Sequence, residues 1–483
     1  MKKASKRKDG FFEWFYWLLP VVLFIFQAIF TSNSLNQIRY EELAESVRNP
    51  FWLEYRFIYD AISSNVGWYA ILLFTYKLLG FGLFGARYVR LVLGLISLIC
   101  LAAILKKYLK RAAFVPLIAI GLSPTILYFN TLSAQFGIDL QYLPICLFLI
   151  TKTGSNRVSN LLASFGLGLV SMIAWMSYPA FIYFLPVLVI FFICKNIKNK
   201  KHLFVGFFGF LLPLVLSFFY IKNSRLLLGD SLGHFGLFRG GGTFSFEANL
   251  FLQNLKVTLE NLFLRPGGYN FELYRAEFSG IYPILTLLAS FLSIFVLWRV
   301  KKELRFPILS ILSVLIFNVL IAYFSQDPYG GLRRMTGILA AIYGFYTLGW
   351  FFVSSLKQGG LRYLGMFLLV LLPLHHLLVF GPNLSHLADP SQFAERQWFA
   401  LAGSPQQSLA SMLQTVQSTG LDLACRDEKG EMAECRYSEI FAAVEGSCLW
   451  NRLSCKSING YDWKTKEFIP LNVDLWNTHY FGH

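Results

Sequence analysis

Charged residues are scarce in this sequence of 483 residues: they make up 14% of it, whereas soluble domains average about 25%. Acidic residues are scarcer than basic ones, with 27 Asp and Glu against 43 Lys and Arg. No heptad repeat and no collagen-like period is visible, which excludes a coiled coil and a collagenous chain. The hydrophobic share of 55% and the mean hydropathy of +0.52 instead indicate an all-α polytopic membrane protein.

Eleven apolar runs are candidates to cross the hydrocarbon core as helices. They lie near residues 11–31, 89–105, 112–130, 139–151, 159–176, 179–194, 203–221, 281–299, 305–324, 335–354 and 361–380. Residues 67–84 form a twelfth candidate, which we place as a re-entrant or juxtamembrane helix. The first run follows a basic segment, as a signal peptide would, but it lacks an Ala-x-Ala-like cleavage site. We therefore expect it to be an uncleaved anchor.

The basic residues lie mostly in short clusters between these runs. With residues 67–84 kept out of the span count, the clusters at 2–8, 106–111, 152–157, 195–201, 299–305 and 357–362 all fall on one side of the membrane. The positive-inside rule then predicts a cytoplasmic N-terminus. It also predicts outer segments at 32–88, 131–138, 222–280 and 325–334, followed by an exported tail. This distribution favours membrane topology over nucleic-acid binding.

The chain divides into two chemically different parts. Residues 1–380 carry 35 Lys and Arg and 15 Asp and Glu, whereas residues 381–483 carry 8 and 12. We expect 1–380 to be the transmembrane domain and 381–483 a small exported domain, helical over 392–419.

Four tail cysteines indicate two disulfides. A zinc site is the alternative, but no Cys-x-x-Cys pair supports it. These cysteines are Cys425, Cys435, Cys448 and Cys455.

Two features of the outer segments suggest a site. Asp139 stands at the mouth of an apolar run, where an unpaired carboxylate is costly; it is either a catalytic acid or base or a solvated loop residue. Arg333 and Arg334 break the positive-inside pattern, which indicates an anion on the outer side. Arginine forks match phosphate oxygens. The alternatives are that they cap a helix or pair with Asp327 or with lipid headgroups.

The first outer loop resembles the start of a known family. The matching pieces are residues 38–45 (IRYEELAE), 66–69 (VGWY), 76–81 (YKLLGF) and 85–88 (GARY), and then Ser123-Pro124 through Asp139. They resemble GT-C glycosyltransferases of the protein-mannosyltransferase and aminoarabinose-transferase type. The resemblance covers about residues 11–150, and the rest of the chain matches by topology.

The resemblance implies a GT-C-like fold and a glycosyltransferase that uses a dolichyl- or undecaprenyl-phosphate sugar at the outer face of an inner membrane. The acceptor would be a lipid, a glycan or a protein. Glu41 or Glu42 would be the base, with Asp139 as the supporting acid, which could also hold a divalent metal. The resemblance assigns Arg333, Arg334, Lys77 and Tyr40 to the donor and its phosphate.

One departure from the family pattern leaves other functions open. When Tyr40 and Glu42 are aligned with the family's Tyr and Glu, Asn36-Gln37 falls where the family has an acidic pair. An amide cannot act as a base, so either Glu41-Glu42 replaces that pair or the protein binds its lipid carrier without catalysis. A transporter or flippase for a lipid-linked glycan is a further alternative, although no internal repeat is visible. The sequon at Asn383 also leaves a eukaryotic membrane open.

Overall fold

The computed structural model describes most of the expected transmembrane part. The described residues are 13–26, 37–39, 67–68, 71–72, 74–75, 85–131, 137–154, 157–223, 247–264, 278, 280–324, 330–388, 399–401, 442–444, 458–462 and 467–471.

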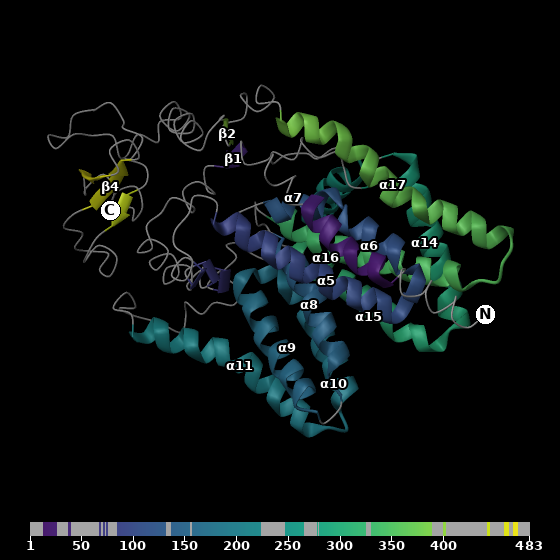
Figure 1. Ribbon diagram of the computed structural model, residues 1–483, viewed down its shortest axis with the longest axis horizontal. Helices are drawn as coiled ribbons and strands as arrows, with labels where there is room; N and C mark the ends of the chain where they lie inside the picture. Colours follow the sequence, from purple (N-terminus) through teal and green to yellow (C-terminus); the bar gives the residue numbers. More distant parts are fainter. Residues whose placement is uncertain are drawn as a thin grey trace.

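These residues form a bundle of helices (Figure 1). The first described helix is Glu13–Phe26. It continues through α5 (Gly85–Leu109), η1 (Lys110–Ala113), α6 (Phe114–Gly121), α7 (Pro124–Thr131), α8 (Ile138–Lys152), α9 (Val158–Ser177), η2 (Pro179–Tyr183), α10 (Leu185–Asn196), α11 (Lys200–Asn223), α13 (Ala248–Leu259), η3 (Glu260–Leu264), α14 (Ile281–Val300), η5 (Lys302–Leu304), α15 (Arg305–Ala322), α16 (Gly330–Ser355) and α17 (Gly360–Ala388).

Helix is present in every one of the eleven apolar runs, so the class of a polytopic α-helical membrane protein is confirmed. Five helical stretches of the described chain are long and apolar enough to cross a membrane. They are Val89–Gly121, Val158–Ser177, Ile281–Val300, Thr336–Ser355 and Gly360–Leu378. The number of spans, eleven, stays a prediction. Helix α17 runs on to Ala388, past the domain boundary expected at residue 380.

The sequence predicts one helix over the run 112–130. The structure instead has two short helices there. Helix α6 ends at Gly121, and α7 begins at Pro124. The hydroxyl oxygen of Ser123 accepts a 3.2 Å hydrogen bond from the backbone N–H of Ile126, as an N-cap does. Proline suits the first helical position because it has no N–H to satisfy there. Ser123-Pro124 therefore starts a new helix inside an apolar run.

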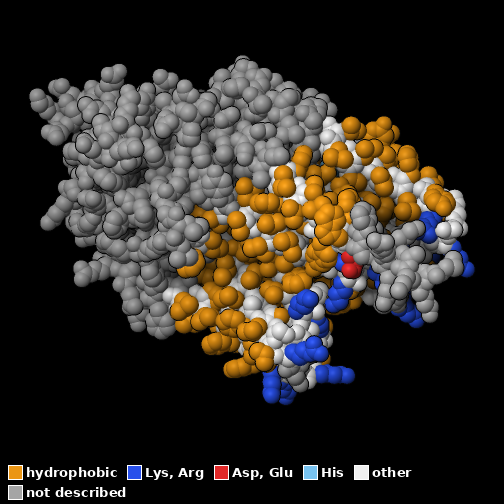
Figure 2. Space-filling view, in the orientation of Figure 1, with side chains coloured by type: hydrophobic (Ala, Val, Ile, Leu, Met, Phe, Trp, Pro, Cys, Tyr) orange, Lys and Arg blue, Asp and Glu red, His pale blue; other side chains and the backbone are white. Residues whose placement is uncertain are grey.

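The bundle has a lysine end, which we define by the basic clusters that follow α5, α8, α10, α14 and α16. On the visible face, Lys and Arg gather along the lower and right-hand rim, next to a broad apolar surface (Figure 2). The opposite end, which we call the Asp139 end, includes the beginnings of α5 and α8. Asp139 and Lys152 lie at the two ends of α8, about 20 Å apart at 1.5 Å per residue. The described basic clusters lie at helix ends, whereas the predicted cluster at 2–8 lies outside the described residues and the membrane side that the clusters face stays a prediction.

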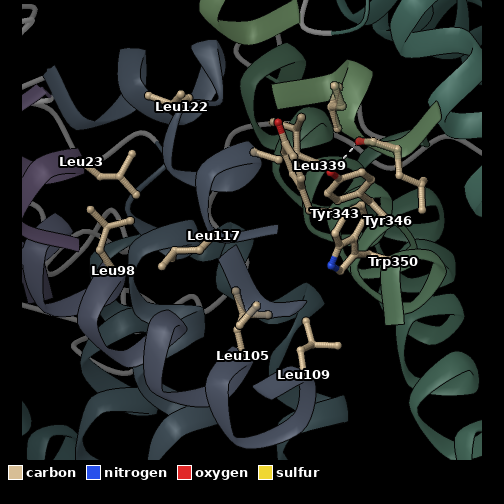
Figure 3. Packing of buried hydrophobic residues seen from close by; sticks show 14 of the residues in the cluster. Leu23, Leu98, Leu105, Leu109, Leu117, Leu122, Leu339, Tyr343, Tyr346 and Trp350 are labelled. Atoms are coloured by element: carbon tan, nitrogen blue, oxygen red, sulfur yellow. Dashed lines mark hydrogen bonds between the residues drawn. The ribbon is translucent and has the colours of Figure 1, made fainter. Parts of the chain in front are cut away.

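Two large hydrophobic clusters and a smaller one between α14, α15 and α16 hold the described bundle together. The first joins the helix Glu13–Phe26 to α5, α6, α16 and α17, and Figure 3 shows its leucines facing the aromatic side chains of α16. Two hydrogen bonds anchor these aromatics: Trp350 Nε1 donates to the carbonyl of Ala112 at 2.5 Å, and the Tyr346 hydroxyl donates to that of Leu369 at 2.8 Å. The buried indole of Trp350 and the buried phenol of Tyr346 thus have hydrogen-bond partners that a lipid environment does not supply.

The second cluster packs α8, α9, η2 and α10 together with Trp68 and Leu72. Both of these side chains are fully buried, so part of the segment 67–84 packs against the bundle. Helices α9 and α11 lie close together because glycines line their contact. A Cβ added to Gly168 would lie 2.0 Å from the carbonyl oxygen of Gly206. Small residues allow such close approach of membrane helices.

The strands belong to the first outer loop and the tail. Strand β1 (Gln37–Arg39) pairs antiparallel with β2 (Phe399–Leu401). Strands β3 (Ala442–Val444), β4 (Ile458–Asp462) and β5 (Glu467–Leu471) form a second antiparallel sheet. The prediction of helix over 392–419 is therefore wrong at 399–401. Because β1 and β2 are paired, residues 37–39 of the first outer loop lie next to residues 399–401 of the tail.

Candidate functional site

Asp139 is placed at the beginning of α8 by the glycine before it. Gly137 has a φ of +71°, and a Cβ there would lie 2.3 Å from the ring of Phe129. Only glycine fits such a position without strain. The turn puts Asp139 in the first turn of α8, where the helix dipole favours an anion.

The side chain of Asp139 is fully buried. The alternative that Asp139 is a solvated loop residue is therefore wrong. The guanidinium of Arg90 on α5 and the hydroxyl of Thr336 on α16 both act to stabilise its anion. Neither carboxylate oxygen has a hydrogen bond of good geometry among the described residues. Three helices thus enclose one carboxylate that retains hydrogen-bonding capacity.

Arg90 is also fully buried, and several contacts fix its position. Its Nη2 donates a hydrogen bond to the carbonyl of Phe129, and its guanidinium lies 6.0 Å from the centroid of the Trp68 ring. The side-chain amide of Gln141 donates to the carbonyl of Arg90 at 3.1 Å and to Asn130 Oδ1 at 2.5 Å. The cation beside Asp139 is therefore held by α5, α7, α8 and the segment around Trp68. A divalent metal bound to Asp139 would be repelled by this cation.

The structure brings the Asp139 position and the Arg333-Arg334 turn to the same end of the bundle. Both arginines belong to the first turns of α16, and Thr336 follows Arg333 by three residues. Residues three apart in a helix are neighbours on its surface. Since Thr336 bears on Asp139, the backbone of α16 carries Arg333 to within about one turn of the buried carboxylate.

An apolar cavity lies next to this polar site. It has a volume of about 320 Å³, and its walls come from α5, α6, α7, α8, α10, α15 and α16. Leu140 and Leu143 of α8, which closely follow Asp139, line it together with Leu339 and Tyr343 of α16. Helices α8 and α16, which carry Asp139 and Thr336, therefore also line the apolar cavity.

The large outer loop contributes a helix at the Asp139 end. Helix α13 packs on the end of α15, where Asn254 Nδ2 donates to the carbonyl of Tyr323 at 2.6 Å and the Phe251 ring packs at a tilt against Tyr323 and Phe324. The backbone N–H of Phe278 donates to Leu262 at 2.9 Å. This helix of the large outer loop therefore packs on the spans.

Several predicted site residues lie outside the described residues. These are Tyr40, Glu41, Glu42, Lys77 and the four tail cysteines, and Arg333 and Arg334 are described only in their backbone. The disulfides stay a prediction; the cysteines that the structure does describe, Cys100, Cys146 and Cys194, are free.

Among the described residues no group of three metal-binding side chains occurs. His376 is buried and pairs through Nδ1 with the carbonyl of Ala119 at 2.9 Å, in a packing role.

Sequence reasoning missed Arg90, Gln141 and Trp68. The signal for Arg90 was present, because it stands with Arg87 at the outer end of a predicted span. Arg333 and Arg334 were singled out because they are cations on the side where the positive-inside rule expects few. Arg90 stands out for the same reason. Gln141 and Trp68 give no such signal, since a buried amide and a buried indole are recognised only from their partners.

Together, the helices and the site define a polytopic α-helical membrane protein with a buried carboxylate and a buried arginine at the end opposite its lysine clusters. No family model and no curated protein matches the chain. Among solved structures, it is similar to ArnT from Cupriavidus metallidurans bound to undecaprenyl phosphate, at 12% identity and a TM-score of 0.48, over 78% of this chain and 79% of that chain. The apo state of the same protein gives 12% identity and a TM-score of 0.45 over the same shares. At such scores the likeness carries no information on activity or ligand.

Proposed function

We propose that this protein transfers a sugar from a polyprenyl-phosphate donor to an acceptor at the Asp139 end of the bundle, on the outer face of the membrane. The observation that carries the proposal is the meeting of a buried carboxylate, the arginine-bearing turn of α16 and an apolar cavity. A polyprenyl-phosphate sugar needs these three elements: an apolar chamber for the chain, cations for the phosphate and acids near the sugar.

The reaction begins when the acceptor hydroxyl attacks the anomeric carbon. A new carbon–oxygen bond forms there, and the bond from that carbon to the phosphate oxygen breaks. Polyprenyl phosphate leaves with the electron pair, and the hydroxyl proton passes to a carboxylate base. Atoms and charge balance without any oxidant or reductant.

The first outer loop supplies the base in this proposal. Glu41 or Glu42 takes the proton, with Tyr40 and Lys77 at the donor, as the family resemblance implies. Strand β1 ends at Arg39 and is paired with β2, so the chain enters this acidic stretch from an anchored strand. Asp139 then acts as the supporting acid, held by Arg90 and Thr336.

Arg333 and Arg334 bind the leaving phosphate in this proposal. Their place in the first turns of α16 adds the positive end of the helix dipole to two guanidinium groups. Charge developing on the leaving phosphate is stabilised by such fixed cations. The cavity next to Leu140 and Leu339 would hold part of the polyprenyl chain.

The test is release of polyprenyl phosphate from a panel of polyprenyl-phosphate sugars by the purified protein in lipid. We expect Glu42→Gln or Glu41→Gln to lower turnover by about 10²- to 10⁴-fold, the usual contribution of a general base. Asp139→Asn and Arg333→Ala/Arg334→Ala should also lower it by at least about 10²-fold. Glu260→Gln is the control, because this half-exposed acid of η3 pairs with Lys256 at 3.9 Å.

A non-catalytic lipid-carrier-binding protein is the second candidate, because Asn36-Gln37 stands in place of the family's acidic pair. Binding of the donor that depends on Arg333 and Arg334, without turnover of any donor, would favour it. Absence of binding as well would exclude both functions and favour a transporter.

A further inference from the structure

Three lysines from three helices line one cavity at the lysine end of the bundle. The cavity has a volume of about 590 Å³. Lys107 of α5, Lys152 at the end of α8 and Lys195 in the last turn of α10 line it together with polar residues that include Thr151, Thr153 and Asn160. None of the described residues that line it is acidic. The described lining therefore has the charge of an anion site.

Packing holds this cavity in shape. The ammonium of Lys195 donates a hydrogen bond to the carbonyl of Ile150 near the end of α8. Asn196 Nδ2 donates to Thr153 Oγ1 at 3.0 Å, which joins α10 to the turn after α8. Gly154 has a φ of +112°, and a Cβ there would touch Lys195 Cε at 3.4 Å. The stem of Lys195 and the end of α8 thus form one fixed wall of the cavity.

Like-charge repulsion acts within the cavity. Lys195 lies just beyond the predicted span 179–194, and its pKa is lowered from 10.5, first by burial and then by the charge of Lys107. An anion between the two ammonium groups would offset this repulsion.

An apolar stripe on α5 leads into the cavity. Ile96, Ile99, Ala103 and Lys107 follow at helical spacing on one face. Ile96 and Ile99 are 44% and 43% exposed, whereas Ala103 and Lys107 line the cavity. From Ile96 to Lys107 the helix rises about 17 Å, close to half of a hydrocarbon core of about 30 Å. The stripe therefore has the depth of one membrane leaflet.

We propose that this cavity binds the phosphate group of an anionic phospholipid, whose acyl chain lies along the Ile96, Ile99 and Ala103 stripe. The three ammonium groups donate to the phosphate oxygens, and the aliphatic lysine stems lie near the glycerol. Basic pockets between membrane helices on the cytoplasmic side suit such headgroups. The site lies at the end of the bundle opposite Asp139 and is independent of the proposed transfer reaction.

The experiment measures binding of phosphatidylglycerol and of phosphatidylcholine with the same acyl chains to the purified full chain by native mass spectrometry. We expect phosphatidylglycerol to bind more tightly. In Lys107→Gln/Lys152→Gln its affinity should fall by about thirtyfold, roughly fivefold per lysine. This double variant keeps the hydrogen bond of Lys195. If it does not fold, Lys107→Gln alone is measured, with an expected loss of affinity of about fivefold.

Lys198→Gln/Lys302→Gln is the matched control, because it removes the same charge from exposed lysines outside the cavity. Its affinity for phosphatidylglycerol should stay as in the unaltered protein. An equal loss in both pairs would overturn the proposal, since binding would then follow net charge alone. A competition with inorganic phosphate distinguishes a lipid headgroup from free phosphate as the ligand. The lipid assignment is wrong if inorganic phosphate displaces phosphatidylglycerol. It is also wrong if inorganic phosphate binds through the same lysines as tightly as the lipid does.

Discussion

Gln141 donates a hydrogen bond of 3.1 Å from its side-chain amide to the backbone carbonyl of Arg90, which ties the start of α8 to the start of α5. The same amide donates to Asn130 Oδ1 at 2.5 Å. One side chain therefore fixes the relative positions of the elements that enclose Asp139.

The first prediction concerns this amide. Gln141→Leu leaves the carbonyl of Arg90 and the side chain of Asn130 without these donors in a buried site, and each such loss costs about 1–3 kcal/mol. We expect the free energy of unfolding in bicelles to fall by about 3 kcal/mol. Gln253→Leu, at an exposed position on α13, is the control and should change it little. Equal stability of the two variants would contradict the assigned role of Gln141.

The second prediction concerns the charges of Arg90 and Asp139. Removing one partner of a buried charge pair leaves the other uncompensated, at a cost of about 3–5 kcal/mol. We expect Arg90→Met and Asp139→Asn each to destabilise the fold, with the double variant losing less than the sum of the two. A double-mutant cycle of unfolding free energies should give a coupling of at least about 1 kcal/mol. Additive losses would show that the two charges do not interact.

The third prediction tests the glycine contact between α9 and α11. In Gly168→Ala the new methyl group meets backbone atoms of Gly206 and Phe210 at 2.0 and 2.6 Å, so the helices must move apart. We expect a loss of about 1–3 kcal/mol in unfolding free energy. Gly166→Ala is the matched control on the same helix, because its Cβ meets only Leu149 at 3.8 Å, and alanine favours helix by up to about 1 kcal/mol.

The fourth prediction concerns the reactivity of Lys195. Burial and the charge of Lys107 lower the pKa of Lys195. At a given pH, a larger fraction of Lys195 is therefore the neutral amine than in an ordinary lysine. It should therefore react faster with an amine-directed acylating reagent than its exposure alone predicts. Lys107→Gln removes one cause, so the pKa should rise and acylation of Lys195 should slow. Peptide mass spectrometry measures the rate, with the exposed Lys198 as the internal reference; an unchanged ratio would refute the coupling.

The helices were predictable from sequence because a membrane helix must be apolar along nearly its whole length. The basic clusters likewise marked their common end. The break at Ser123 was not predicted, since Ser123-Pro124 interrupts the hydropathy of 112–130 too briefly. At the site, the unusual positions of Asp139 and Arg333 were visible in the sequence. The enclosure of Asp139 was not, because Arg90 and Thr336 meet it only through tertiary packing.

The break at Ser123 also bears on how the chain enters the membrane. Helices α6 and α7 have eight residues each, or about 12 Å of rise, so neither alone reaches across a hydrocarbon core of about 30 Å. Backbone groups at the break are exposed to lipid unless surrounding protein covers them, and the hydroxyl of Ser123 and the neighbouring helices provide that cover. This segment therefore depends on its neighbours for stable residence in the bilayer, and its integration is a step of tertiary assembly as well as of insertion.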